Sequence, residues 1–139
     1  MNDSVKILNY YVIEKACQYD FDVSELDPVP VGYIQDFDTV FFNGCVNNIN
    51  LEKSVVASGD RFNDNVKDIS TINNMGASLR DMEGGSIAQV CTANNVPFIM
   101  IKGVTDVYGS KTAAEQFVSN LKKVSLGFAP IVSNIIKNI

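Results

Sequence analysis

The chain has 139 residues, of which 46% are hydrophobic and 19% are charged, and its formal net charge is −5. This composition predicts a packed core rather than a disordered tail, and the length suits one domain over residues 1–139. The acidic balance argues against surfaces that bind nucleic acid or an anionic membrane, because such surfaces need clustered positive charge. We therefore expect neither a nucleic-acid partner nor a membrane partner.

The sequence contains no histidine and three widely spaced cysteines, Cys17, Cys45 and Cys91. A Ser-His-Asp triad and an imidazole zinc site are therefore impossible, and acid–base chemistry must come from carboxylates, Lys or Tyr. Because there is no C-x-x-C pair, we expect reduced thiols, as in a cytoplasmic protein. We also expect the cysteines to serve as small, buried apolar residues. Met1 is followed by polar residues, and no apolar run could cross a membrane, so we expect neither a secretory signal nor a transmembrane helix.

The first half of the chain predicts short strands separated by turns. Tyr10–Val23 is rich in β-branched and aromatic residues and favours a strand, although Ile7, Tyr11 and Lys15 also fall on one helical face, which would suit a helix. The prolines of Asp27–Pro30 end regular structure. Thr39–Phe42 and Ser54–Ser58 are apolar runs typical of buried strands, and the Asn-rich residues 43–50 between them, which begin with Asn43-Gly44, predict a turn.

The second half predicts helices that alternate with a strand. Asp81 is expected to cap a helix that ends at Asn94, and the apolar run Pro97–Ile101 is expected to form a central strand. Thr112–Glu115 matches a capping box, which opens a helix with a kink expected at Pro130. The apolar stripe of that helix is Phe117, Leu121, Val124 and Phe128, continued by Ile131 and Ile135. This order of strands and helices predicts an α/β fold.

Three polar segments lie at junctions between a strand and the following element, where open α/β sheets place their ligands. The three segments are Ser58–Phe62, Arg80–Gly85 and Lys102–Asp106. Within the last, Asp106 is either an ordinary turn residue or a carboxylic acid that can hand its proton to a leaving group. Glu83 is either a first-turn helix residue or a carboxylate that accepts hydrogen bonds from a vicinal diol.

Two apolar residues in the same segments have a similar pair of interpretations. Phe62 is a core residue or, if it lies exposed in a cleft, a flat apolar face for a heteroaromatic ring. Met82 is a core residue or a soft contact surface for a ligand. The pattern by itself leaves both interpretations open for each residue.

Taken in order, these segments resemble the 5′-methylthioadenosine/S-adenosylhomocysteine nucleosidase family of the purine nucleoside phosphorylase superfamily. The matching pieces are SGDRF at Ser58–Phe62, DMEGGSIAQVC at Asp81–Cys91, VPF at Val96–Phe98 and KGVTD at Lys102–Asp106, with QYDFDVS at Gln18–Ser24 before them. The resemblance runs from about Val5 onward and favours the strand over the helix at Tyr10–Val23. It implies a layered, mixed-sheet α/β fold of the nucleoside phosphorylase and nucleosidase type, as a single domain whose N-terminal part is missing here.

The resemblance implies hydrolysis of the N-glycosidic bond between adenine and a 5-thio-ribose, without a metal or another cofactor. Asp106 is the implied general acid, which protonates or hydrogen-bonds N7 of adenine. Thr105 stands where the family often has a small hydroxyl residue before the acid, and is expected to orient it. Glu83 is the implied ligand of the ribose hydroxyls.

Further positions carry over as binding residues for a purine thio-nucleoside. Phe62 is expected to stack on adenine, the backbone of Asn63 to contact its Watson–Crick edge, and Met82 to pack beside the sugar. The family works as a dimer in which a loop of the neighbouring subunit lines the 5′-thio pocket. Leu26 and Pro28 are the matching positions, so a homodimer is expected.

The sequence departs from the family in ways that leave other functions open. No residue matches the glutamate that activates water, and the aromatic residue after the acid falls on Ala113 or Ala114. Lys102 stands where many members have Arg. The alternatives are a purine nucleoside phosphorylase, which uses phosphate in place of water, and a non-catalytic remnant that binds purine nucleosides or only dimerises.

Overall fold

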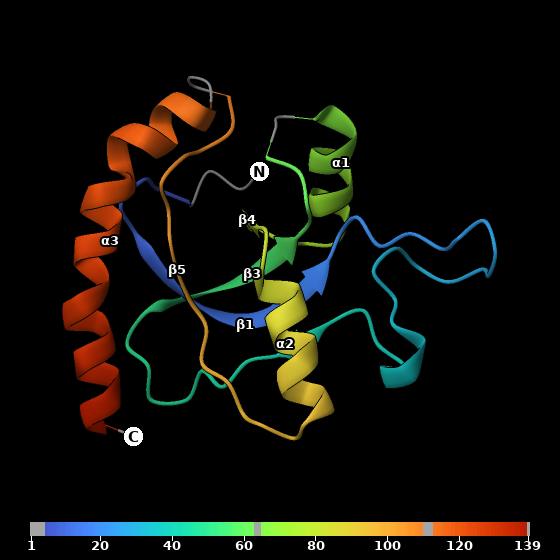
Figure 1. The fold of residues 1–139 in the computed structure, drawn as a ribbon, viewed down its shortest axis with the longest axis horizontal. Helices are drawn as coiled ribbons and strands as arrows, with labels where there is room; N and C mark the ends of the chain where they lie inside the picture. The colour runs from blue at the N-terminus through green and yellow to red at the C-terminus, as the bar shows by residue number, and fades with distance from the viewer. Residues whose placement is uncertain (1–4, 63–64, 110–112, 139) are drawn as a thin grey trace.

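The structure is a computed structural model that describes residues 5–62, 65–109 and 113–138 (Figure 1). Its strands are β1 (Tyr10–Gln18), β2 (Phe42–Asn43), β3 (Glu52–Ser58), β4 (Leu79–Asp81) and β5 (Ile101–Gly103). Its helices are the short 3₁₀ helix η1 (Gln35–Phe37) and the α-helices α1 (Val66–Asn74), α2 (Gly84–Ala93) and α3 (Ala113–Asn138). Within the described residues, no helix is both long enough and apolar enough to span a membrane.

The strands form one mixed sheet with β1 at its centre. β1 runs parallel to β3, which in turn runs parallel to β4. The other edge of β1 pairs antiparallel with two short strands, first β5 at Tyr10–Val12 and then β2 at Lys15–Ala16. The register of β1 against β3 shifts between Ile13 and Lys15, which places an irregularity between these two pairings.

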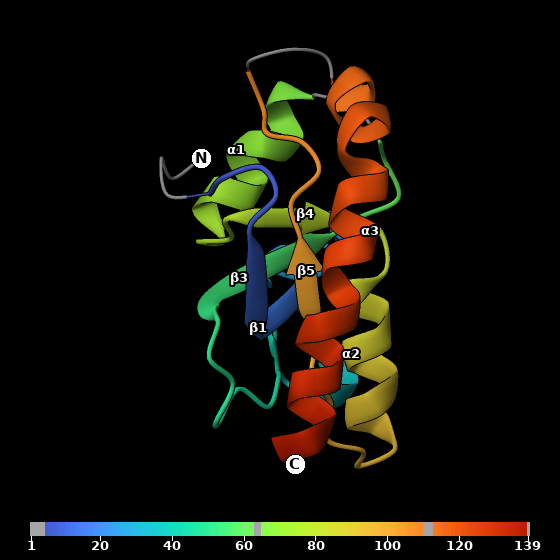
Figure 2. The same cartoon turned by 90° about the vertical axis from the view of Figure 1, so that its left-hand side faces the viewer.

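Helices cover both faces of this sheet, as Figure 2 shows. Val56 and Ala57 are neighbours on β3, and successive side chains of a strand point to opposite faces. Val56 belongs to a buried cluster with Ala88 of α2, whereas Ala57 belongs to a second cluster with Ile72 of α1. The molecule is therefore a layered α/β fold with a mixed sheet, as the sequence predicts.

The long helix α3 packs against the N-terminal end of β1 through Tyr10. The Tyr10 hydroxyl donates a 2.7 Å hydrogen bond to the Val124 carbonyl, and its ring meets Phe128 edge to face, with centroids 5.1 Å apart. Gly127 lies against the same ring, and a Cβ at this position would collide with the Tyr10 side chain. A glycine is needed here because the helix backbone approaches an aromatic ring so closely.

The structure corrects several predicted elements of the first half. β1 ends at Gln18, well before Val23. Residues 39–41 are not a strand, since the Thr39 hydroxyl bonds both the N–H and the C=O of Phe41 in a local turn, and β2 begins only at Phe42. Asn43-Gly44 is not a turn: Asn43 belongs to β2, and the Gly44 N–H bonds Glu14.

The second half also differs from the prediction. Helix α1 was not predicted, and strand β4 was implied only as an unassigned strand at the Arg80–Gly85 segment. The run Pro97–Ile101 is not a central strand: β5 begins at Ile101 and pairs with β1 over three residues, while the preceding carbonyls of Phe98 and Met100 bond Cys45 and Ile13. α3 begins at Ala113 and continues through Pro130, and Thr112 of the predicted capping box lies outside the described residues.

Candidate functional site

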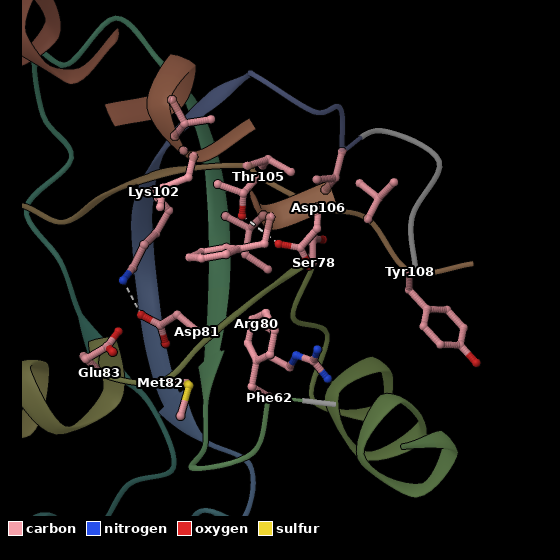
Figure 3. A pocket seen from close by; sticks show the side chains of 18 of the residues that line it. Phe62, Ser78, Arg80, Asp81, Met82, Glu83, Lys102, Thr105, Asp106 and Tyr108 are labelled. Atoms are coloured by element: carbon pink, nitrogen blue, oxygen red, sulfur yellow. Dashed lines mark hydrogen bonds and ion pairs between the residues drawn. The ribbon is translucent and has the colours of Figure 1, made fainter. Parts of the chain in front are cut away.

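A pocket of about 540 Å³ opens beside the carboxyl end of β4, and residues of α3 form part of its wall (Figure 3). All three segments singled out in the sequence contribute to its wall, although they are far apart along the chain. The predicted site residues that line it are Phe62, Met82, Glu83, Thr105 and Asp106. Of the others, Leu26 and Pro28 lie on an exposed loop outside the pocket, and Asn63 lies outside the described residues.

One side of the pocket is aromatic. The Phe62 side chain is 49% exposed, so it is a wall residue rather than a core residue. Its ring meets Phe117 of α3 edge to face, with centroids 5.6 Å apart and an interplanar angle of 74°. This contact leaves the ring of Phe62 with open surface toward the pocket, which suits stacking by a flat heteroaromatic ligand.

Asp106 lies in the loop that follows β5, on the pocket wall. The Thr105 hydroxyl donates a 2.6 Å hydrogen bond to Oδ1 of the Asp106 carboxylate. This bond fixes one carboxylate oxygen and leaves Oδ2 for a ligand. Both residues are half-buried, so the carboxylate is accessible from the pocket.

Hydrogen bonds to the Asp81 side chain stabilise the turn that carries Met82 and Glu83. The Asp81 carboxylate accepts a 2.9 Å hydrogen bond from Gly84 N–H, although the N-cap residue of α2 is Glu83 and not Asp81 as predicted, because Asp81 still belongs to β4. It also accepts a hydrogen bond from Ser58, whose Oγ accepts in turn from Gly85 N–H at 2.6 Å. Lys102 forms an ion pair with the same carboxylate.

These bonds leave Met82 and Glu83 at the pocket wall with exposed side chains. Figure 3 places Met82 between Glu83 and Phe62, so the carboxylate and the aromatic ring lie toward different ends of the pocket. Asp106 lies toward the far side of the pocket from Glu83. A ligand that reaches all of them would need an aromatic end and a hydroxylated end.

A second ion pair holds the segment that carries Phe62. Arg61 donates two hydrogen bonds, of 2.9 and 2.8 Å, to the carboxylate of Asp68 in α1, whose side chain is buried. This bidentate geometry fixes Arg61 and with it the neighbouring Phe62. The Asp68 carboxylate raises the pKa of the Arg61 guanidinium above its ordinary value.

Sequence reasoning missed some residues that shape the pocket. Phe117 and Leu121 were assigned to the core stripe of a helix, yet both line the pocket. Tyr108 lines it too, and its place two residues after the matched segment Lys102–Asp106 was a usable signal. Within the described residues, no group of three or more His, Cys, Asp or Glu side chains could hold a metal ion.

The chain is similar to known nucleosidases. The chain is 32% identical to a 5′-methylthioadenosine/S-adenosylhomocysteine nucleosidase of Arabidopsis thaliana over 122 residues, which are 86% of this chain and 47% of that protein. It is 28% identical to an aminodeoxyfutalosine nucleosidase of Campylobacter jejuni, over 91% of this chain and 61% of that protein. The chain thus spans about half the length of these curated relatives.

A solved structure shares the fold. It is the 5′-methylthioadenosine/S-adenosylhomocysteine nucleosidase of Helicobacter pylori, in complex with an amino-pyrrolopyrimidine joined to a thioether-bearing hydroxypyrrolidine. The TM-score is 0.87 at 25% identity, and the match covers 99% of this chain and 64% of that chain. The family model described as "Phosphorylase superfamily" matches residues 1–137. Because that match extends over almost the whole sequence, the chain belongs to the phosphorylase superfamily.

Proposed function

We propose that this chain carries the base-binding and ribose-binding part of a nucleosidase that hydrolyses the N-glycosidic bond of 5′-methylthioadenosine or S-adenosylhomocysteine. The observation that supports this most is the convergence of Phe62, Glu83 and Asp106 on one pocket. An aromatic face, a diol acceptor and a proton donor are the groups that release of a purine base needs. The named relatives are nucleosidases, which favours hydrolysis over phosphorolysis.

Asp106 is the proposed general acid. A purine anion is a poor leaving group, so a proton or a strong hydrogen bond at N7 lowers the barrier to cleavage of the glycosidic bond. The ribose then passes through an oxocarbenium-like state. Thr105, which donates to Oδ1, would leave Oδ2 of Asp106 to face N7.

The remaining proposed contacts hold the two ends of the substrate. The exposed Glu83 carboxylate would accept hydrogen bonds from the 2′ and 3′ hydroxyls, since each of its oxygens has free lone pairs for a donor. Met82 would pack beside the sugar, and the open face of Phe62 would stack on adenine. The backbone of Asn63 is the proposed contact for the Watson–Crick edge of the base.

We further propose that the protein is a cytoplasmic homodimer. Leu26 is 89% exposed on a loop that extends away from the sheet in Figure 1. This exposure leaves the Leu26 side chain available for contact with a second copy of the chain, at a position that matches the interface loop of the family. In the proposed dimer, Leu26 and Pro28 line the 5′-thio pocket of the neighbouring subunit.

Activation of water is the step for which the described residues supply the fewest suitable groups. Among the described residues of the pocket wall, the carboxylates are Asp81, Glu83 and Asp106. Asp81 is engaged by Lys102 and Ser58, and the other two are assigned to the substrate. We therefore expect this chain to turn over more slowly, by about 10²–10⁴-fold, than a protein that also supplies a base for water.

Release of free adenine from methylthioadenosine tests the proposal. We expect slow release that does not depend on phosphate, and a further loss of about 10²-fold or more in Asp106→Asn, whose amide cannot deliver a proton. Strict dependence on phosphate would favour the phosphorylase alternative. Equal rates in wild type and Asp106→Asn would remove Asp106 as the acid, and nucleoside binding without any release would favour the non-catalytic alternative.

A further inference from the structure

The backbone around Asp106 is held by side chains of α3. Gln116 accepts a 3.1 Å hydrogen bond from the N–H of Val107 and donates a 2.9 Å bond to the carbonyl of the same residue. Asn120 donates a 2.9 Å bond to the carbonyl of Thr105. The residues immediately before and after Asp106 are therefore both tied to one helix.

The two amides lie on the same face of α3, because they are four residues apart. Gln116 is 4% exposed, which makes it one of the few buried polar side chains among the described residues. A primary amide has one acceptor and one donor group, and here both meet a single residue, Val107. This pairing fixes the orientation of the loop as well as its distance from the helix.

The loop has a different anchor where it begins. Val104 exchanges backbone hydrogen bonds with the N-terminal segment, at 2.9 Å with Leu8 and 3.0 Å with Asn9. Beyond Val104, residues 105–107 belong to no strand or helix. The position of the Asp106 carboxylate thus depends on the side chains of α3 and not on a sheet ladder.

We propose that Gln116 and Asn120 are positioning residues, which hold the Asp106 carboxylate where it meets N7 of the bound purine. This inference rests on the proposed role of Asp106. It extends that role to a helix whose next residues, Phe117 and Leu121, line the pocket. The helix therefore shapes the pocket and also sets the place of the acid. Catalytic geometry is sensitive to such support, since a shift of about 1 Å at a reacting group costs about 10²-fold in rate.

The test uses the full chain and adenine labelled with ¹⁵N at N7, so it does not depend on turnover. Both the N7 chemical shift on binding and the dissociation constant are measured. Two variants remove the hydrogen bonds but keep the size of the side chain, Gln116→Met and Asn120→Leu. Ser119→Ala is the matched control, because Ser119 is an exposed residue of the same helical turn that bonds only the helix carbonyl of Gln116 among the contacts described. Asp106→Asn gives the shift expected without the acid.

We expect both variants to lose most of the N7 shift that separates wild type from Asp106→Asn, while adenine affinity stays within about threefold because Phe62 still stacks on the base. Ser119→Ala keeps the wild-type shift. A full shift in both variants would overturn the inference, as would loss of shift and affinity in equal measure. If wild type and Asp106→Asn already give the same N7 shift, the proposed function itself fails, and the two failures are thereby distinguished. If Gln116→Met does not fold, the result for Asn120→Leu decides the test, because Asn120 is only half-buried.

Discussion

Lys102 and Asp81 form an ion pair between β5 and β4, two strands that belong to different parts of the sheet. The Asp81 side chain is 10% exposed and the Lys102 side chain 26%. The pair therefore links the strand that leads to Asp106 with the turn that carries Glu83. Its position makes it a structural tie between the two ends of the proposed site.

Loss of this cation should destabilise the fold. In Lys102→Met, the Asp81 carboxylate keeps its hydrogen bonds from Ser58 and Gly84 N–H but loses the positive charge that neutralises it. We expect the free energy of unfolding to fall by about 1–3 kcal/mol, as measured by urea denaturation. Lys122→Met, at an exposed position of α3, is the control and should change it by less than about 0.5 kcal/mol. Equal effects in the two variants would mean that the ion pair contributes nothing.

Truncation of Phe62 should weaken adenine binding without unfolding the protein. Base–aromatic stacking contributes about 1–3 kcal/mol per base, so Phe62→Ala is expected to raise the dissociation constant about 5–150-fold in calorimetry. Phe21→Ala is the matched control, because Phe21 is 40% exposed, close to the 49% of Phe62, but lies outside the pocket. Similar affinity in both variants would exclude Phe62 as the stacking residue.

The apolar pattern of the sequence was sufficient for the parts of the fold that bury apolar residues in a regular way. β3, α2 and α3 lie where hydrophobic runs or stripes predict them, whereas the pattern of β1 also suited a helix and the family resemblance favoured the strand. The three polar segments, which lie at the carboxyl ends of β3, β4 and β5, meet in one pocket. The matched family motifs supplied their order, and the layered α/β arrangement brings them together.

The secondary-structure elements that the sequence pattern did not predict either bury polar side chains or are very short. α1 has a buried face that includes Asp68, a carboxylate that pattern reading assigns to solvent, and it is buried because Arg61 bonds it. The one local signal was Asn65, whose side chain caps the helix by accepting from Lys67 N–H. Gln116 is a similar case, since no sequence pattern indicates that its amide binds the loop of Asp106.

The cysteines provide a test of the core. Cys17 is fully buried and its thiol contacts the Val56 carbonyl. Cys45 is exposed and Cys91 is only partly buried, contrary to the expectation that all three are buried. With iodoacetamide under native conditions, we expect Cys45 to react quickly and Cys17 only after unfolding. Mass spectrometry of the digested protein identifies the modified residue. Rapid native labelling of Cys17 would contradict the packing described.

The same thiol makes stability depend on pH at the alkaline end. Burial, and secondarily the charge of Asp81, raises the pKa of Cys17 from its ordinary 9.0 to about 12. Above pH 9 the unfolded thiol loses its proton while the native thiol keeps it, so the free energy of unfolding falls as pH rises toward 12. The Cys17 contribution to that slope approaches about 1.4 kcal/mol per pH unit. It should be absent in Cys17→Ala and present in Cys45→Ala, as measured by urea denaturation between pH 8 and about pH 10.5.

The most direct test of the central claim is a crystal structure of the chain with adenine bound. The proposed function predicts that the base lies over the open face of Phe62, with N7 within hydrogen-bond distance of the Asp106 carboxylate. It also predicts that the position of N9 leaves room for a ribose between the base and Glu83. Adenine bound in this pocket with N7 turned away from Asp106, or bound only elsewhere on the chain, would contradict the account.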